Sequence, residues 1–288
     1  MEWVETLVQG VLLGGLYALF ATGLSLIFGV MRLVNIAHGD LIVLAAFVAL
    51  VVTQGLGLHP LLSLLVVVPA MAAVGYGLQR GLLNRTLGGD ILPPLLVTFG
   101  LSIVIQNALL EIFTADSRKL QVGALETASL ELGGGLAIGW LPLIVFAAAV
   151  LVIAALQFLF YRTALGRALR ATSDDPETAR LMGIDNHHLF GLAMAIALAV
   201  VAIAGVFLAI RTNFDPTIGP GRLIYAFEAV IMGGLGSLWG TLAGGVLLGV
   251  AQSIGARIDP GVQILAGHLA FLALLVARPR GLFPRAVD

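Results

Sequence analysis

Few side chains in this sequence have the types and spacing that catalysis requires. Ser237 lies in the segment GLGSLWG, whose order of serine and glycines does not fit the GxSxG nucleophile elbow, and no HExxH zinc motif occurs. The presence of His268 elsewhere is a weak basis for an intramembrane serine protease, because mere co-occurrence of the two residue types says little about geometry. We therefore expect no catalytic residues and no enzymatic activity.

The sequence does not indicate a metal or nucleotide site either. It has no cysteine, which excludes disulfides and thiolate metal sites, and His38 has no second histidine or carboxylate with ligand spacing on the same helix. The single lysine, Lys119, follows Arg118 rather than glycine, so no GxxxxGK[ST] phosphate loop occurs. We expect no bound cofactor, and the chain cannot be an ATPase by itself.

The residues that could act in transport are polar groups within apolar segments. A charged side chain at mid-membrane costs about 2.5–3.5 kcal/mol, so such residues usually face protein or a water-filled cavity. Asn35, His38 and Asp40 lie between two apolar runs, beside Gly39, which permits an unusual backbone. The pattern predicts either a simple loop or a broken helix near 31–40 that lines a permeation route, and the residues alone leave both open.

Two further polar groups lie inside apolar runs. Glu228 comes six positions after Arg222, which is not ideal same-face spacing, so it is either a carboxylate near the external interface or a gate or pore-lining residue. Gln106 and Asn107 are uncharged amides, which join helices more often than they contact substrate. The candidate translocation-path residues are therefore Asn35, His38, Asp40, Gln106, Asn107 and Glu228.

The composition predicts the elements that must position these residues. The 288 residues are 59% hydrophobic and 11% charged, with a mean hydropathy of +1.05, which excludes a water-soluble fold. A spanning helix needs about 20 apolar residues. We predict one all-α domain, 1–288, a polytopic membrane protein with about eight transmembrane helices (seven to nine), from the stretches without Asp, Glu, Lys or Arg: 6–31, 41–79, 91–110, 132–161, 186–210, 229–256 and 260–277.

Glycine and proline indicate how these helices are divided and packed. The stretch 41–79 is long enough for two helices, which we expect to separate near Gly55, Gly57 and His59-Pro60. Small residues at helix contacts let backbones approach closely, and we expect this packing role, rather than a hinge role, for the glycine pairs Gly14-Gly15, Gly233-Gly234 and Gly244-Gly245.

The distribution of arginine predicts the side on which each loop lies, because cytoplasmic loops carry an excess of Lys and Arg. We predict that the loops at 80–85 and 162–187 and the C-terminus are cytoplasmic, from Arg80, Arg85, Arg162, Arg167, Arg170, Arg180, Arg278, Arg280 and Arg285. The segment 115–137 is then the longest external loop, with a turn or hairpin at Gly133-Gly134-Gly135, and the N-terminus lies outside.

A second external loop contains Asp215-Pro216 and Gly219-Pro220, whose prolines should prevent continuous helix. A rigid loop of this kind suits the docking of another protein. It equally suits a structural cap over the helices, and the sequence leaves both open.

The segment 162–187, RTALGRALRATSDDPETARLMGIDNH, is too polar for the lipid interior. Asp174 and Glu177 have the spacing of a capping box, Pro176 suits a first turn and Gly183 suits a left-handed stop, so we predict a helix of about eight residues. A helix this short is not stable alone and must pack against something. Its mixed charge favours a protein partner over lipid headgroups, which attract helices with a basic face.

Three stretches resemble one family: VNIAHGD at 34–40, GRALRATSDDPETARLMGID at 166–185 and DPTIGPGRLIYAFEAVIMGGLGSLWGTLAGG at 215–245. Together, in this order, they resemble the LivH-like permease subunit of branched-chain amino acid ABC importers, and the resemblance covers nearly the whole chain. It favours the broken helix near 31–40. It also implies that 171–183 includes a helix that couples to an ATPase, through Arg167, Arg170, Asp174, Asp175, Glu177, Arg180 and Gly183.

The resemblance further implies the partners and the place of action. We expect a multi-pass protein of the bacterial cytoplasmic membrane, in contact with lipid but not nucleic acid, that works with two ATPase subunits holding ATP and magnesium, a periplasmic substrate-binding protein, and a second homologous permease or a second copy of this chain. The expected activity is alternating-access import of branched-chain or related amino acids. Amides, urea and aromatic acids are alternative substrates of similar permeases.

An ion-coupled secondary transporter is the remaining alternative. Such a transporter would favour several acidic or polar groups clustered at mid-depth, whereas Glu228 is almost alone in its segment.

Overall fold

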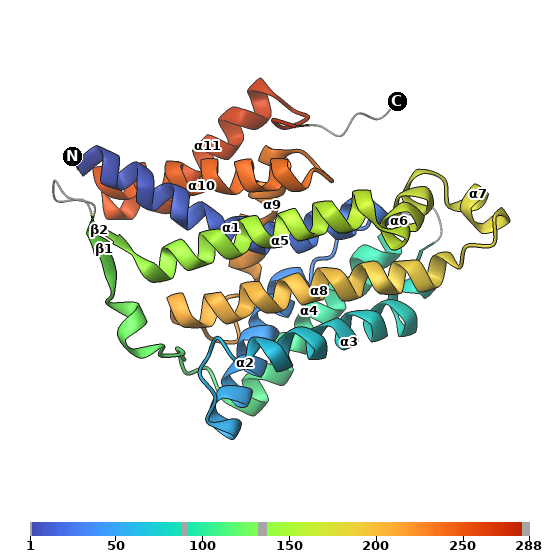
Figure 1. Cartoon of the computed structure of the whole chain (residues 1–288), viewed down its shortest axis with the longest axis horizontal. Helices are drawn as coiled ribbons and strands as arrows, with labels where there is room; N and C mark the ends of the chain where they lie inside the picture. Colours follow the sequence, from blue (N-terminus) through green and yellow to red (C-terminus); the bar gives the residue numbers. More distant parts are fainter. Residues whose placement is uncertain (1, 88–91, 132–136, 284–288) are drawn as a thin grey trace.

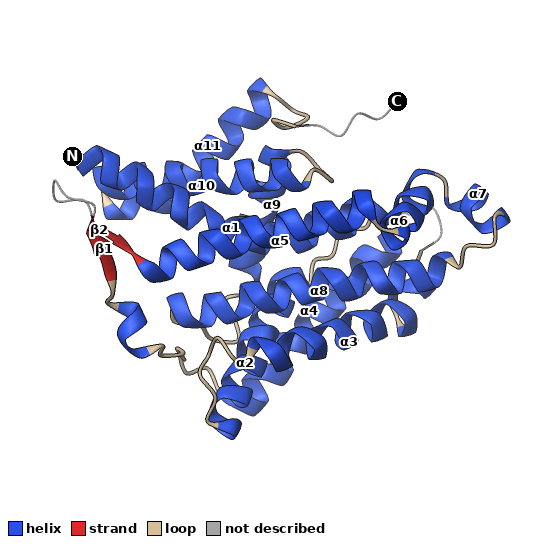
Figure 2. Cartoon of the chain, in the orientation of Figure 1, coloured by secondary structure: helices blue, strands red, loops and turns tan. Residues whose placement is uncertain are grey.

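The computed structural model describes residues 2–87, 92–131 and 137–283 and is almost entirely helical (Figure 1, Figure 2). Eight of its helical segments are long and apolar enough to cross a membrane, which confirms the predicted number. They contain α1 (Glu2–Met31), α2 (His38–Leu56), α3 (Leu64–Gly81), α4 (Leu92–Phe113), α5 (Trp140–Arg162), α8 (Asn186–Arg211), α10 (Leu238–Ile258) and α11 (Gln263–Ala277).

Three further helices complete the described α-helical part: α6 (Ala164–Asp174), α7 (Pro176–Leu181) and α9 (Gly219–Gly233). The apolar stretch 229–256 therefore does not form one span. It holds the end of α9 and most of α10, because the chain turns at Gly234 and Gly236, both of which have positive φ. With 15 residues, α9 is about 22 Å long, shorter than the roughly 30 Å hydrocarbon core.

The break in 41–79 lies where glycine and proline predicted it. α2 ends at Leu56, Gly57 adopts the left-handed conformation, and α3 begins four residues after Pro60. By contrast, Gly219 and Pro220 belong to the first turn of α9 rather than to a non-helical loop. A proline is tolerated there because its missing N–H would have no intrahelical partner in any case.

The long helices α1 and α8 lie at the centre, and most of their side chains are buried. α1 packs along α10 and also contacts α5, α8 and α9, whereas α3 packs along α8. Glycines allow the closest contact: a Cβ on Gly14 would lie 2.4 Å from Val246 Cα, and one on Gly249 would lie 2.4 Å from Gly10 O. The close approaches at Gly14-Gly15 and Gly244-Gly245 support the packing role expected for those pairs, whereas Gly234, with φ of 106°, lies at the turn that ends α9.

The two polar loops lie at opposite ends of the bundle (Figure 1). One end carries the antiparallel strands β1 (Ser129–Glu131), within the segment 115–137, and β2 (Ala137–Gly139), which begins at its last residue. The opposite end carries α6 and α7. The predicted turn at Gly133-Gly134-Gly135 falls outside the described residues, but the strands on either side of it pair as a hairpin would.

Hydrogen bonds group the loops at each end. Arg118 and Phe214 exchange two backbone hydrogen bonds of 2.8 and 2.9 Å, which join 115–137 to the segment before α9. At the other end, Arg80 forms an ion pair with Asp185 at 3.7 Å, and Asn84 donates to the His187 carbonyl. The loops predicted to share a side of the membrane therefore lie together.

Candidate translocation path and coupling segment

The interruption between α1 and α2 lies inside the bundle. α1 ends at Met31, Arg32 takes a positive φ of 51°, and the chain is irregular until His38. Asn35 is 1% exposed, and its Oδ1 accepts from the Ala37 N–H. His38 is fully buried, with Nε2 2.7 Å from the Phe20 carbonyl oxygen of α1. The segment is thus a buried break between helices rather than a surface loop.

Asp40, in the first turn of α2, is held by two side chains from α4. Ser102 donates to Asp40 Oδ2 at 2.5 Å, and Gln106 Nε2 donates to Oδ1 at 3.0 Å. Gln106 therefore joins two helices, as expected of an amide in a span. Asn107 is exposed and donates only to the Ile103 carbonyl of its own helix among the described residues, so the structure separates the two amides.

Ser102 was not predicted as a site residue. Its position four residues before Gln106 places both on one face of α4, and this spacing is the only sequence signal that links them.

Gly39 has a different role from the one its sequence context suggested. It lies in the first turn of α2 and is not among the described residues with positive φ, so glycine is not needed here for an unusual backbone conformation. A Cβ at this position would lie 2.0 Å from the Gly219 carbonyl oxygen, and a Cβ on Gly219 would lie 2.0 Å from Asp40 Oδ1. The two glycines let the starts of α2 and α9 touch beside the Asp40 carboxylate.

Glu228 lies nine residues further along α9, about 13 Å from Gly219 along the helix axis. It is 4% exposed, and its Oε1 accepts a short hydrogen bond from Nδ1 of His268 on α11. Glu228 is therefore not almost alone, contrary to the sequence interpretation. Sequence could not reveal this partner, because the two residues are 40 positions apart and meet only when α9 packs on α11.

A short helix is present where the sequence predicted one for coupling, but its start differs by one residue. Asp174 is the last residue of α6, and Asp175 is the N-cap of α7: its side chain accepts from the N–H groups of Glu177 and Thr178, each at 3.0 Å. The capping-box prediction at Asp174 is therefore wrong. Asp175 takes the cap because its extended backbone, with φ −145° and ψ 95°, aims its carboxylate at the open N–H groups.

These hydrogen bonds also act on the charge of Asp175. The Thr178 hydroxyl donates to Asp175 Oδ2 at 2.6 Å, and this bond, with that from the Thr178 N–H, holds the pKa of Asp175 below its usual value. The helix is six residues long rather than about eight, and Gly183, with φ of 85°, follows it in the left-handed conformation that was expected.

α6 was not predicted as a separate element. Thr163 caps it by accepting from the Gly166 N–H, and Ser173, near its end, donates to the Gly29 carbonyl of α1 at 2.6 Å. All the predicted coupling residues except Arg170 are exposed: Arg167, Asp174, Asp175, Glu177, Arg180 and Gly183. The guanidinium of Arg170 lies instead over the Tyr161 ring at 4.7 Å, as in a cation–π contact.

α7 projects from the end of the bundle (Figure 1). The two residues at its end, Leu181 and Met182, are 86% and 79% exposed. One short helix thus carries both charged side chains and an apolar tip. It packs on α6 and α8.

Comparison with known proteins identifies the family of this chain. Residues 6–277 match the family described as the permease component of the branched-chain amino acid transport system. The chain belongs to this family.

The permease is also similar to individual members. The high-affinity branched-chain amino acid transport system permease protein BraD of Pseudomonas aeruginosa is 32% identical over 99% of this chain and 96% of its own. LivH of Escherichia coli, described as a permease of the same kind, is 26% identical with the same coverage. The fructose import permease protein FrcC of Rhizobium meliloti is 28% identical over 84% of this chain and 69% of its own.

A solved structure shares the fold of the permease. It is a chain of PsaBC from Streptococcus pneumoniae, determined in complex with Fab, with a TM-score of 0.51 and 14% identity over 97% of this chain and 96% of that one. The all-α polytopic architecture predicted from the sequence is thus confirmed.

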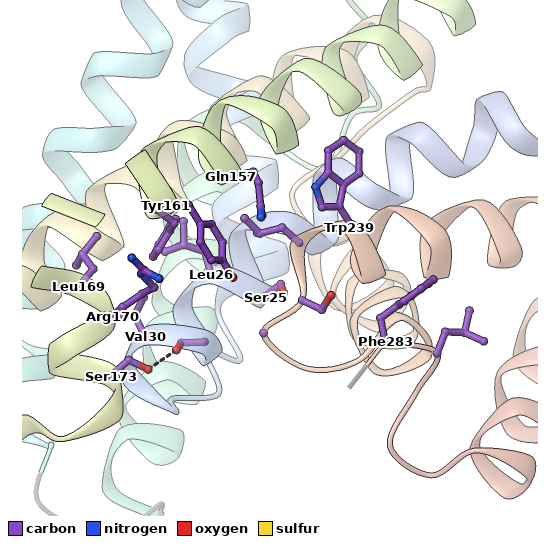
Figure 3. A pocket seen from close by; sticks show the side chains of 16 residues that line it. Ser25, Leu26, Val30, Gln157, Tyr161, Leu169, Arg170, Ser173, Trp239 and Phe283 are labelled. Atoms are coloured by element: carbon purple, nitrogen blue, oxygen red, sulfur yellow. Dashed lines mark hydrogen bonds between the residues drawn. The ribbon is translucent and has the colours of Figure 1, made fainter. Parts of the chain in front are cut away.

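The permease has a cavity of about 550 Å³ next to α6 (Figure 3). Its walls come from α1, α5, α6, the turn before α10, the first residues of α10 and the segment after α11, with Ser25, Arg170, Ser173, Trp239 and Phe283 among the lining residues. The hydrogen bond between Ser173 and Gly29 closes one side of it. α6 therefore contacts α1 through the Ser173–Gly29 hydrogen bond and has open space beside it.

Proposed function

We propose that this permease is the membrane-spanning subunit of an ATP-driven importer for branched-chain amino acids. The observation that carries the proposal is α7, a capped helix with an apolar tip that projects from one end of a membrane bundle whose sequence has no phosphate loop. A separate ATPase is the partner that supplies both the missing nucleotide site and a surface for this helix. The substrate class follows the relatives that match the full length of the chain.

The proposed complex has two permeases on two ATPase subunits, with a periplasmic binding protein on the opposite side. The second permease is a homologue or a second copy of this chain. In this arrangement α7 and the C-terminus face the cytoplasm of a bacterial cytoplasmic membrane, and the 115–137 segment faces the binding protein. The arginines near α6 and the ion pair between Arg80 and Asp185 support the cytoplasmic side.

The proposed mechanism is alternating access, driven by nucleotide that binds the two conformations with different affinity. Movement of the ATPase displaces α7 and α6. The hydrogen bond from Ser173 passes that displacement to α1, which packs on α9 and α10. The short α9 then moves Asp40 and Glu228, which lie near its two ends.

Charge reversal on α7 tests the coupling role. The double variant Glu177→Arg, Arg180→Glu keeps the net charge but places like charges against any complementary partner, so the binding-protein-independent ATPase activity of the assembled complex should fall about tenfold or more. Its matched control is Lys119→Glu, Glu126→Lys, which reverses an ion pair at the opposite end of the bundle and should leave that activity unchanged. Unchanged ATPase activity in the α7 variant would refute the assignment.

A binding panel tests the substrate class. The partner binding protein should bind leucine, isoleucine and valine in preference to urea and aromatic acids, as measured by isothermal titration. Failure of all three amino acids to bind would overturn the substrate while leaving the coupling role of α7 intact.

A further inference from the structure

Seven polar residues from five helices, Glu228 among them, lie close together. Tyr17 donates to Gln252 Oε1 at 2.5 Å, and its ring lies 5.1 Å from that of Tyr225. Tyr17 also interacts electrostatically with Arg211, Arg222 and Glu228. With His268, which holds Glu228, these residues form what we term the Glu228 cluster: Tyr17 of α1, Arg211 of α8, Arg222, Tyr225 and Glu228 of α9, Gln252 of α10 and His268 of α11.

The Glu228 cluster contains buried polar atoms without a hydrogen-bond partner among the described residues. They are one oxygen of the carboxylate, one nitrogen of the amide and one nitrogen on each guanidinium: Glu228 Oε2, Gln252 Nε2, Arg211 Nη1 and Arg222 Nε. Glu228 and Gln252 are 4% and 1% exposed, so solvent at the molecular surface does not satisfy them. Buried polar groups are nearly always paired, and charged ones are the costliest to leave open.

Two of the open atoms belong to oppositely charged residues of α9, Arg222 and Glu228, with Tyr225 midway between them in the sequence. Arg222, Tyr225 and Glu228 follow one another at three-residue spacing, which places them on neighbouring positions of the helix surface. The Arg222 guanidinium carbon lies 5.9 Å from the centre of the Tyr225 ring. The ring of His268, the residue that holds Glu228, also stacks on Tyr225, with 6.4 Å between the ring centres. The Arg222 cation and the histidine that holds the Glu228 carboxylate thus both contact one aromatic ring.

We propose that the Glu228 cluster binds the zwitterionic head group of an amino acid during its passage, an inference that rests on the proposed function and deepens it. Glu228 Oε2 accepts from the α-ammonium group, and Arg222 Nε donates to the α-carboxylate. Charge-assisted hydrogen bonds of this kind are shorter and stronger than neutral ones. Because His268 is 36% exposed while Glu228 is 6% exposed at its side chain, the ligand approaches from the His268 side.

Direct binding to the permease–ATPase complex in lipid nanodiscs, without binding protein, tests the site. The probes are leucine, leucinamide, which lacks the carboxylate, and 4-methylpentanoate, which lacks the ammonium group. Saturation-transfer NMR, which detects millimolar affinities, should show leucine binding and a dissociation constant about tenfold or more higher for each analogue, because each loses one charge-assisted contact.

Two variants assign each contact to a residue. Glu228→Gln should raise the dissociation constant of leucine to that of 4-methylpentanoate and leave the dissociation constant of 4-methylpentanoate unchanged. Arg222→Gln should raise the dissociation constant of leucine to that of leucinamide and leave the dissociation constant of leucinamide unchanged. The matched control is Glu126→Gln, the same carboxylate-to-amide change at the ion pair with Lys119 outside the Glu228 cluster, and leucine binding should stay within about threefold.

A purely structural cluster whose open atoms bind water would give a different result. Glu228→Gln would then change all three probes equally, or leucine would not bind the wild-type complex at all, and either outcome overturns the site. ATP-driven leucine uptake by the wild-type complex with its binding protein is measured in parallel. Uptake without head-group discrimination refutes the site alone, whereas absence of uptake refutes the proposed function.

Discussion

The contact between α1 and α10 allows a quantitative test of how glycine shapes this bundle. In Gly14→Ala the new Cβ would lie 2.4 Å from Val246 Cα and 2.7 Å from the Gly245 carbonyl oxygen. Non-bonded carbon atoms favour a separation of about 3.5–4.0 Å, so the two helix backbones must move apart by about 1 Å or more. Both obstructing atoms are backbone atoms, so a change of rotamer cannot relieve the contact.

The matched control is Gly77→Ala in α3, where a Cβ would have nothing within 4 Å. Both substitutions replace glycine within a helix and gain about 1 kcal/mol of helix propensity. The difference between the two variants therefore isolates the steric term. Overpacking of a tight interior costs about 1–3 kcal/mol, so Gly14→Ala should be less stable than Gly77→Ala by about that amount.

Unfolding by sodium dodecyl sulfate from mild detergent micelles, followed by circular dichroism, measures this difference. Gly77→Ala should unfold at or above the wild-type midpoint, and Gly14→Ala clearly below it. If the two variants unfold at the same midpoint, α1 and α10 do not pack at the described distance and the reasoning fails.

Further predictions concern the N-cap of α7 and the buried Asp40. Asp175→Ala should abolish coupled ATP hydrolysis in the assembled complex while Asp175→Asn, which retains a capping oxygen, keeps it; equal activities would refute the cap. Because hydrogen bonds lower the pKa of folded Asp175, the cap is fully formed above the ordinary aspartate pKa near 4 and is lost as pH falls through the lower folded value. A spin label at residue 181 should gain mobility over that acid range, and Asp175→Asn should remove the pH dependence. Asp40→Ala should lower the free energy of unfolding by about 1–3 kcal/mol, since Ser102 and Gln106 lose their acceptor, whereas Asp40→Asn should cost less; the detergent titration described above compares them.

The sequence alone determined the membrane architecture and the location of the short polar helix α7. A bilayer requires uninterrupted apolar stretches of a set length, so composition predicts the number of spans without any knowledge of packing. Turn and cap residues act within a few positions, so Gly57, Pro176 and Gly183 indicated where helices begin or end. The one-residue error at the cap arose because Asp174 and Asp175 are adjacent and both can cap a helix, and only the backbone conformation selects between them.

The tertiary structure decided which polar residues share a site. Asp40 meets Ser102 across 62 positions, and Glu228 meets His268 across 40, and no local pattern encodes either pair. The split between α9 and α10 was equally hidden, because both helices are apolar enough to form one continuous stretch. Composition predicts that a segment is buried in lipid or protein. Only the packing of one helix on another fixes which buried carboxylate gains a partner and which polar atoms remain open for a ligand.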